Sequence, residues 1–225
     1  SALEEGDDLD YFSVIAGSSS SPAGWIHVFA PMAIPHAYVA DDAARLKNAV
    51  SKPVLVAGRI NQPQTASEIL SEGKADMIGM ARALIADPEF VKKVAQNRSD
   101  HIRARIGCNQ ACVGHRLTHH PISCIQNPRT GREQLFQNTN LSQSTKTVMV
   151  IGGGPGGMKA AVTAAEHGHR VLLFEQQARL GGQVNLAELL PGRAEFGGVT
   201  TNLVHELERN SVDVYLNSTV SSGTV

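Results

Sequence analysis

All three cysteines of the 225-residue sequence lie in one short stretch, RIGCNQACVGHRLTHHPISC at 105–124. Thiolates such as those of Cys108, Cys112 and Cys124 bind metal ions and iron–sulfur clusters. An odd number of cysteines so close together suits a metal or cluster in a reducing compartment better than a disulfide framework. Because such sites usually take four protein ligands, the stretch predicts a metal or cluster site whose fourth ligand must be sought elsewhere.

A second chemical pattern is the glycine motif G-x-G-x-x-G, formed by Gly152, Gly154 and Gly157. It follows the apolar run TVMVI and opens a helix rich in small residues. The first glycine permits a tight turn, the second lets the backbone approach a pyrophosphate, and the third lets helix and strand pack closely. Glu175 lies 21 residues beyond Gly154, after a second apolar run, where an acid accepts hydrogen bonds from a ribose. The motif therefore predicts a dinucleotide site.

The acidic side chain of Glu175 reduces the number of candidate ligands for this glycine turn. An acid at this position, rather than an arginine, argues against a 2′-phosphate, which leaves FAD, NAD or an ADP group. The continuation ARLGGQVN adds Gly182 and Gln183, where backbone can lie against a cofactor. The segment resembles the FAD-binding domain of flavoprotein disulfide-reductase-like enzymes, which implies FAD, or ADP alone, at this site.

Two arginines directly follow apolar runs in the first half of the chain. Arg59 comes after PVLVAG and Arg82 after ADMIGMA. If these runs are the last two strands of a (β/α)8 barrel, both arginines lie at the carboxyl rim, where such barrels commonly bind phosphate. Two guanidinium groups can hold a phosphate dianion there. The alternative is that each arginine pairs with a surface acid.

The elements that position these groups alternate between strands and helices over residues 1–104. Near-continuous apolar runs at 11–17, 53–58 and 75–81 predict parallel strands covered on both faces. Amphipathic stretches at 41–50, 63–73 and 87–96 predict helices. This order predicts a parallel sheet or barrel. The polar, unpatterned stretch 129–146 predicts a domain junction.

Composition limits the other classes of function. The net charge is −1 and aromatic residues are sparse, which argues against a nucleic-acid partner. No apolar run has the length of a membrane span, and the acidic start SALEEGDDLD does not fit a signal peptide. We expect a soluble, cytoplasmic protein with a small-molecule substrate, an electron-transfer partner and, as an option, an oligomer. Both ends of the sequence have the character of interrupted domains, so we expect a fragment.

The run VAGRINQPQTASEILSEGKADMIGMARALIADPEF resembles the last barrel units of the old yellow enzyme superfamily. The similarity is to its multidomain branch, which includes 2,4-dienoyl-CoA reductase, trimethylamine dehydrogenase and N-methylproline or dimethylglycine demethylase-like enzymes. The resemblance implies an α/β fold in three parts: the C-terminal part of an FMN-binding (β/α)8 TIM barrel over 1–104, an iron–sulfur loop and linker over 105–146, and an incomplete Rossmann-like FAD/ADP-binding domain over 147–225.

The same resemblance implies cofactors and site residues. Arg59 and Arg82 correspond to FMN-phosphate ligands, with Gly58 and Ala81 supplying backbone nearby. FMN, FAD (or ADP), a 4Fe–4S cluster and, in the intact parent, NAD(P)H are the implied cofactors, and the cluster would relay electrons between the flavin sites.

The cluster motif of this branch is C-x2-C-x3-C-x11-C, and the chain departs from it at one position. Cys108, Cys112 and Cys124 match the last three ligands, whereas the first position is Arg105, whose protonated guanidinium has no lone pair to give. Several readings remain: a 4Fe–4S cluster completed by water or a histidine, a three-iron cluster, no cluster, a zinc site of three cysteines and one histidine, or cysteines that only pack the core. The histidines in reach by sequence are His115, His119 and His120.

The substrate side is predicted from the loop at 17–31. His27 falls close to the active-site histidine of the reductases in this family, where an imidazole can protonate or orient a substrate; the alternative is an ordinary loop histidine. Ser18 stands where trimethylamine dehydrogenase has an aspartate. The resemblance implies an NADH:flavin oxidoreductase, with N-demethylation of a methylated amine or amino acid as the first reading. The alternatives are a 2,4-dienoyl-CoA or enone reductase and a non-catalytic nucleotide-binding or electron-transfer remnant. We expect the isolated 225 residues to be inactive.

Overall fold

The computed structural model of the chain describes residues 4, 8–136, 141–221 and 223. The chain divides into two compact units, Ser1–Thr130 and Gly131–Val225. Each unit contains a three-stranded sheet whose strand pairs are all parallel. The α/β class with parallel sheets is therefore confirmed. The parts of the predicted domains that fall on 1–3, 5–7, 137–140, 222 and 224–225 lie outside the described residues.

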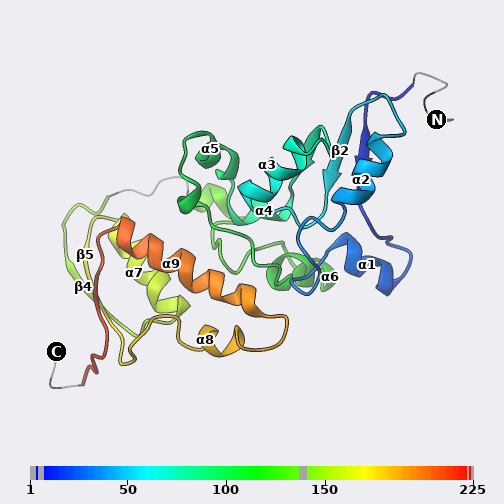
Figure 1. The fold of residues 1–225 in the computed structure, drawn as a ribbon. Coiled ribbons are helices and arrows are strands. Elements are labelled where there is room, and N and C mark those ends of the chain that lie inside the picture. Colours follow the sequence, from blue (N-terminus) through cyan, green and yellow to red (C-terminus); the bar gives the residue numbers. More distant parts are fainter. Residues whose placement is uncertain (1–3, 5–7, 137–140, 222, 224–225) are drawn as a thin grey trace. The chain divides into compact units, whose positions relative to one another are not determined.

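The sheet of the first unit has the order β1-β2-β3 (Figure 1). Its strands are β1 (Phe12–Val14), β2 (Val54–Ala57) and β3 (Met77–Gly79). The helices are α1 (Pro22–Val28), α2 (Ala40–Lys47), α3 (Pro63–Ser71), α4 (Arg82–Ala86), α5 (Phe90–Ala95) and α6 (His115–Leu117). A 3-10 turn covers Ser99–His101 and a π-helical turn covers Gln110–Gly114. The three predicted strands and three predicted helices are all present, each shorter than its sequence run.

The prediction missed three short helices of this unit, α1, α4 and α6. Residues 17–31, predicted to be a loop, contain α1, whose N-terminus is capped by the Ser21 side chain accepting from the Gly24 N–H at 3.1 Å, with Pro22 in the first turn. This is ordinary N-terminal capping chemistry, but seven residues are too few for a clear helical period. The segment after β3 forms α4, so Arg82 is the first residue of a helix and not part of a rim loop.

The core of the first unit lies between β2 and the helices beside it. Val54 and Val56 are fully buried on one face of β2, and they pack with Val39 and Ala43 around α2 and with Ile69 of α3. Period-2 burial along β2 follows from the alternation of side chains in a strand. The core fixes the carboxyl ends of β2 and β3, and these ends carry Arg59 and Arg82.

The second unit repeats the parallel arrangement, with the sheet order β4-β5-β6. Its strands are β4 (Thr147–Ile151), β5 (Arg170–Phe174) and β6 (Asp213–Tyr215). Its helices are α7 (Pro155–Glu166), α8 (Val184–Ala187) and α9 (Gly197–Arg209), with 3-10 turns at Glu133–Phe136 and Ala194–Phe196. Figure 1 shows α7 and α9 running beside each other, next to the strands.

On α7, Met158, Ala161 and Val162 lie on one face and are fully buried. A partly buried ion pair joins this helix to α9, with Lys159 Nζ 2.7 Å from Glu206 Oε2. Gly168, two residues after the end of α7, has φ +87°, and its N–H donates to the Ala165 carbonyl at 2.9 Å. A positive φ favours glycine at this position.

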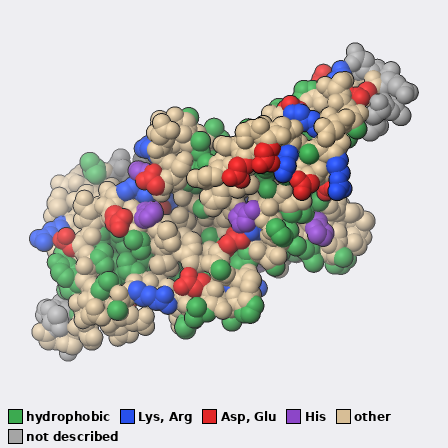
Figure 2. Space-filling view, in the orientation of Figure 1, with side chains coloured by type: hydrophobic (Ala, Val, Ile, Leu, Met, Phe, Trp, Pro, Cys, Tyr) green, Lys and Arg blue, Asp and Glu red, His purple; other side chains and the backbone are tan. Residues whose placement is uncertain are grey.

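Charges of both signs are interspersed over α2 and α3 on the face of the molecule drawn in Figure 2. Two ion pairs connect the helices to neighbouring segments: Lys47 with Asp76 at 2.8 Å and Lys74 with Asp41 at 3.0 Å. Within the described part of the chain, none of the helices has both the length and the apolar character to span a bilayer.

Candidate functional site

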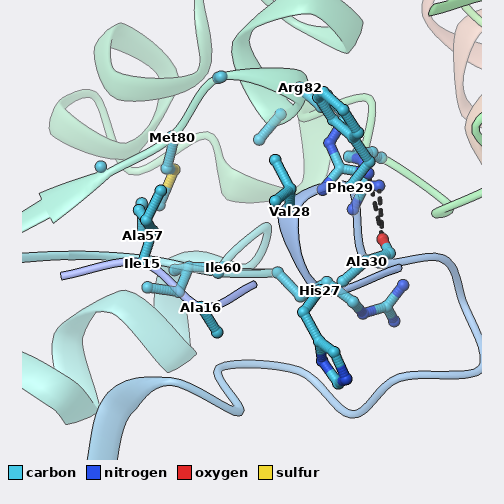
Figure 3. Close-up of a pocket in the computed structure, with 16 residues that line it drawn as sticks. Ile15, Ala16, His27, Val28, Phe29, Ala30, Ala57, Ile60, Met80 and Arg82 are labelled. Carbon is cyan, nitrogen blue, oxygen red and sulfur yellow. Dashed lines mark hydrogen bonds between the residues drawn. The ribbon is translucent and has the colours of Figure 1, made fainter. Parts of the chain in front are cut away.

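The two arginines that follow β2 and β3 line a single cavity of about 240 Å³ (Figure 3). Gly58 and Ala81, the residues just before them, line it too. The structure therefore brings these four predicted residues to one cavity, because the carboxyl ends of neighbouring parallel strands meet at one edge of a sheet. No Asp or Glu is among the described residues that line the cavity, so its charge is positive.

Arg59 is held in place by an unusual backbone conformation. Its φ is +49°, its residue is 4% exposed, and its Nη1 donates to the Pro31 carbonyl at 3.0 Å. A positive φ in a non-glycine residue is strained. Gly107 approaches this guanidinium so closely that a Cβ there would overlap Nη1. The position of Arg59 is thus fixed by its surroundings.

Arg82 is anchored by two acceptors. Its Nη1 donates to the Ala30 carbonyl at 3.1 Å and to Asn109 Oδ1 at 2.6 Å. Burial lowers the pKa of Arg82, the charge of Arg59 adds to this effect, and the Cys112 thiol acts in the opposite direction. Two buried like charges repel each other. A dianion between them would offset that repulsion, and the cavity fits a phosphate group in this respect.

Arg105 and Asn109 are cavity and anchoring residues that the sequence did not predict. Arg105 lines the same cavity. Asn109 has φ +56° and connects the start of the cysteine loop to Phe29 and Arg82. The amide of Asn109 accepts from Arg82 and Arg105 and donates to the Phe29 carbonyl. The bond from Asn109 to the Phe29 carbonyl joins residues 80 positions apart, and that from Arg105 Nη2 to the Ala30 carbonyl joins residues 75 positions apart. No spacing rule within either segment could have indicated them.

His27 lies in α1 and also lines the cavity, with its side chain exposed. In Figure 3 the imidazole points away from Arg82. Its ring centroid is 5.8 Å from that of Tyr38, whose hydroxyl donates to the His27 carbonyl. Burial raises the pKa of the Tyr38 hydroxyl, and the charge of Arg82 acts against this. An exposed imidazole at a cavity mouth can exchange protons with a bound molecule.

The cysteine loop brings its three thiols to one small cavity. Cys108, Cys112 and Cys124 line a space of about 20 Å³, roughly the room for one water molecule. All three are free thiols, and burial raises the pKa of Cys108. Among the described residues, no three His, Cys, Asp or Glu side chains are placed so as to hold a metal ion.

A four-thiolate cluster does not fit the donors of this loop. Arg105 occupies the first ligand position of the motif, and its guanidinium is directed to Ala30 and Asn109. Of the histidines weighed as a fourth ligand, His115 is engaged through Nδ1 with the Pro121 carbonyl at 3.0 Å. The loop as it stands offers three thiols, one fewer than a 4Fe–4S cluster normally takes.

The glycine turn of the second unit has the geometry that its sequence predicts. Gly152 has φ +101°, and open space surrounds the Cβ position of Gly154. A Cβ at Gly157 would overlap the carbonyl oxygen of Gly152, so only glycine fits there. Gly154 precedes α7, whose first turn presents backbone N–H groups. The turn is therefore open where a pyrophosphate would approach.

Glu175, the predicted ribose acceptor, is buried and bonded to the backbone. The residue is only 6% exposed, and its carboxylate accepts from the N–H groups of Gly153 at 2.7 Å and Gln177 at 2.8 Å. Since each carboxylate oxygen has two acceptor positions, a ribose contact stays a prediction. What the structure shows is that Glu175 fastens the glycine turn to the end of β5.

The loop at 178–183 lies against the glycine turn. The Gly181 N–H donates to the Gly153 carbonyl at 2.8 Å, and a Cβ at Gly182 would come within 3.2 Å of the Gly154 Cα. Gln183 is exposed at the start of α8. The predicted cofactor residues Gly152, Gly154, Gly157, Gly182 and Gln183 are thus brought to one place.

Two protein families match this chain. Residues 26–101 match the NADH:flavin oxidoreductase / NADH oxidase family, and residues 147–213 match FAD dependent oxidoreductase. The resemblance to multidomain flavin oxidoreductases is confirmed, and the predicted flavins, FMN and FAD, are those of the matched families.

Individual relatives agree with this assignment. The chain is 40% identical to an NADH oxidase of Thermoanaerobacter brockii over 81% of its length and 28% of that protein. It is 37% identical to an N,N-dimethylglycine/sarcosine dehydrogenase of Chromohalobacter salexigens over 96% of its length and 32% of that protein. Among solved structures, a 2-naphthoyl-CoA reductase complex has a TM-score of 0.89 at 29% identity, over 96% of this chain and 33% of that one. The chain thus spans about a third of the length of these relatives.

Proposed function

We propose that this chain, which belongs with the NADH:flavin oxidoreductases, forms part of a flavin-dependent enzyme that holds FMN phosphate in the Arg59–Arg82 cavity. The observation that carries the proposal is the convergence of both guanidiniums on one cavity without a lining carboxylate. In this reading, β1 to β3 are the last strands of an FMN-binding (β/α)8 barrel, and the second unit begins a Rossmann-like domain for FAD or ADP.

Each side chain has a defined task in this proposal. Arg59 and Arg82 bind the phosphate as charged donors, while Gly58 and Ala81 let the backbone approach it. When bound, FMN supplies two-electron chemistry, taking a hydride from an amine or giving one to an activated alkene. His27, which is among the lining residues, is assigned the task of holding or delivering a proton for the bound substrate.

The first substrate class is a methylated amine or amino acid. The dimethylglycine/sarcosine dehydrogenase, matched over nearly the whole chain, supports it. Loss of a hydride from the N-methyl group leaves an iminium, which takes up water and releases formaldehyde and the demethylated amine. The electrons leave through an acceptor such as the second nucleotide or a partner protein.

A conjugated alkene, as in an enoyl thioester, is the second substrate class. It is supported by His27 among the residues that line the cavity and by the likeness to 2-naphthoyl-CoA reductase. Reduction of an alkene needs a hydride at one carbon and a proton at the other, and in this proposal His27 gives the proton.

Anaerobic stopped-flow absorbance of the full-length protein separates the two classes. If the enzyme is a demethylase, dimethylglycine or sarcosine bleaches the bound flavin. If it is a reductase, 2-naphthoyl-CoA reoxidises flavin that NADH has reduced, and His27→Gln slows this step about a hundredfold. A flavin that dithionite reduces but that exchanges electrons with neither substrate would contradict both, in favour of a non-catalytic remnant.

A further inference from the structure

Arg105 occupies the position of a cluster ligand in the motif, yet its side chain belongs to the arginine cavity. The residue is 8% exposed and lines the cavity together with Arg59 and Arg82. Its Nη2 donates to the Ala30 carbonyl at 3.1 Å and to Asn109 Oδ1 at 3.1 Å.

These two acceptors are also the acceptors of Arg82. Arg82 Nη1 donates to the Ala30 carbonyl and to Asn109 Oδ1, at 3.1 and 2.6 Å. One carbonyl and one amide oxygen thus tie the two guanidiniums together. The next carbonyl along the chain, that of Pro31, accepts from Arg59 at 3.0 Å. Three guanidiniums are therefore anchored by two consecutive backbone carbonyls.

The backbone around Arg105 is fixed as firmly as the side chain. The carbonyl of Arg105 accepts from Asn61 Nδ2 at 2.5 Å, and the Gly107 carbonyl accepts from the Met32 N–H at 3.1 Å. Asn61 is 2% exposed. The start of the cysteine loop is consequently part of the wall of the cavity, and a change of side chain at position 105 acts directly on it.

We propose that Arg105 is a third cationic ligand of the anion site. At position 105 the chain has this extra positive charge in place of the fourth cluster thiolate. An arginine cannot ligate iron, and a cysteine brings no cation to the cavity. The exchange favours an anion with about two negative charges, such as a phosphomonoester. This inference rests on the proposed function, since it assigns a third residue to the proposed phosphate site.

Binding measurements on the full-length protein test the anion half of the proposal. The probes are FMN, riboflavin, which lacks the phosphate, and inorganic phosphate. Arg105→Ala is expected to raise the dissociation constants of FMN and phosphate about tenfold, with riboflavin affinity unchanged. Arg105→Lys recovers part of the loss because it keeps the charge. Arg116→Ala, an exposed arginine of the same loop, is the matched control and changes none of the three.

Arg105→Cys tests the other half. It weakens FMN and phosphate as Arg105→Ala does, and after anaerobic reconstitution it carries about four iron atoms per chain, where the wild type carries about three or fewer. Equal iron contents would overturn the exchange. If Arg105→Ala binds FMN and phosphate as tightly as the wild type does, the anion role of Arg105 is overturned. A wild type that binds phosphate but not FMN refutes the proposed function alone, whereas one that binds neither refutes both.

Discussion

The glycine turn at 152–157 contains two glycines with opposite surroundings. A methyl group at Gly154 would meet open space, and the residue has an extended conformation at φ −73°. A methyl group at Gly157 would overlap the Gly152 carbonyl oxygen. The open space at Gly154 therefore leaves room for a ligand, whereas the fold itself requires a glycine at position 157.

This contrast gives a matched pair of variants. Gly157→Ala is expected to lower the stability of the chain by about 1–3 kcal/mol through overpacking, seen as a lower midpoint of thermal unfolding. Gly154→Ala should change stability by no more than about 0.5 kcal/mol, yet weaken ADP or FAD binding about tenfold because the methyl group takes the approach path of the pyrophosphate. Unchanged nucleotide affinity in Gly154→Ala would argue against a ligand at this turn.

At the residue scale, the sequence predicted which residues gather at each site better than it predicted their hydrogen-bond partners. The arginines, the glycines and the cysteines were chosen from short-range patterns, and the structure brings each set together. The roles of Arg105 and Glu175 were not predictable in this way. Arg105 depends on carbonyls about 75 residues away, and the orientation of the Glu175 carboxylate depends on the N–H groups of two loops.

At the scale of elements, Asp76 joins α2, β2 and the start of β3. Its carboxylate accepts from Lys47 Nζ at 2.8 Å and from the Val54 N–H at 2.9 Å. The hydrogen bond from Lys47, followed by that from Val54, lowers the pKa of Asp76. A group whose pKa is lower in the folded chain stabilises the fold above its unfolded pKa, and this contribution is lost as the pH falls through the folded pKa.

Urea unfolding of the chain, followed by fluorescence of its one tryptophan, Trp25, checks this linkage. Asp76→Asn should lower the urea midpoint at pH 7 and show a smaller drop between pH 7 and about pH 3 than the wild type does. Asp42→Asn is the control, because Asp42 has one exposed partner, Arg45 at 3.4 Å. If the pH dependence of Asp76→Asn equals that of the wild type, Asp76 does not connect these elements as described.

Element types were predictable where the hydrophobic pattern was long, as in β2, α3 and α7. Pro63 and Gly73 marked the ends of α3 because proline suits the first helical turn and glycine suits the positive φ of +69° after the helix. Helices α1, α4 and α6, with seven, five and three residues, were missed. Such short helices depend on tertiary contacts more than on their own period.

At the scale of the molecule, each unit carries a candidate anion site at the carboxyl ends of parallel strands. The first unit uses arginine side chains after β2 and β3, and the second uses backbone groups between β4 and α7. Both designs follow from one geometric rule of parallel sheets, which leaves strand ends and helix starts free for ligands. The family matches fall on the two units separately, at 26–101 and 147–213.

The central claim is that the Arg59–Arg82 cavity binds the phosphate of FMN. Its most direct test is the ratio of FMN to riboflavin affinity, measured by calorimetry on the full-length protein and on Arg82→Ala, with Arg45→Ala as an exposed control. We predict that the wild type prefers FMN and that Arg82→Ala reduces this preference by about tenfold or more, while Arg45→Ala keeps it. An equal ratio in wild type and Arg82→Ala would contradict the account.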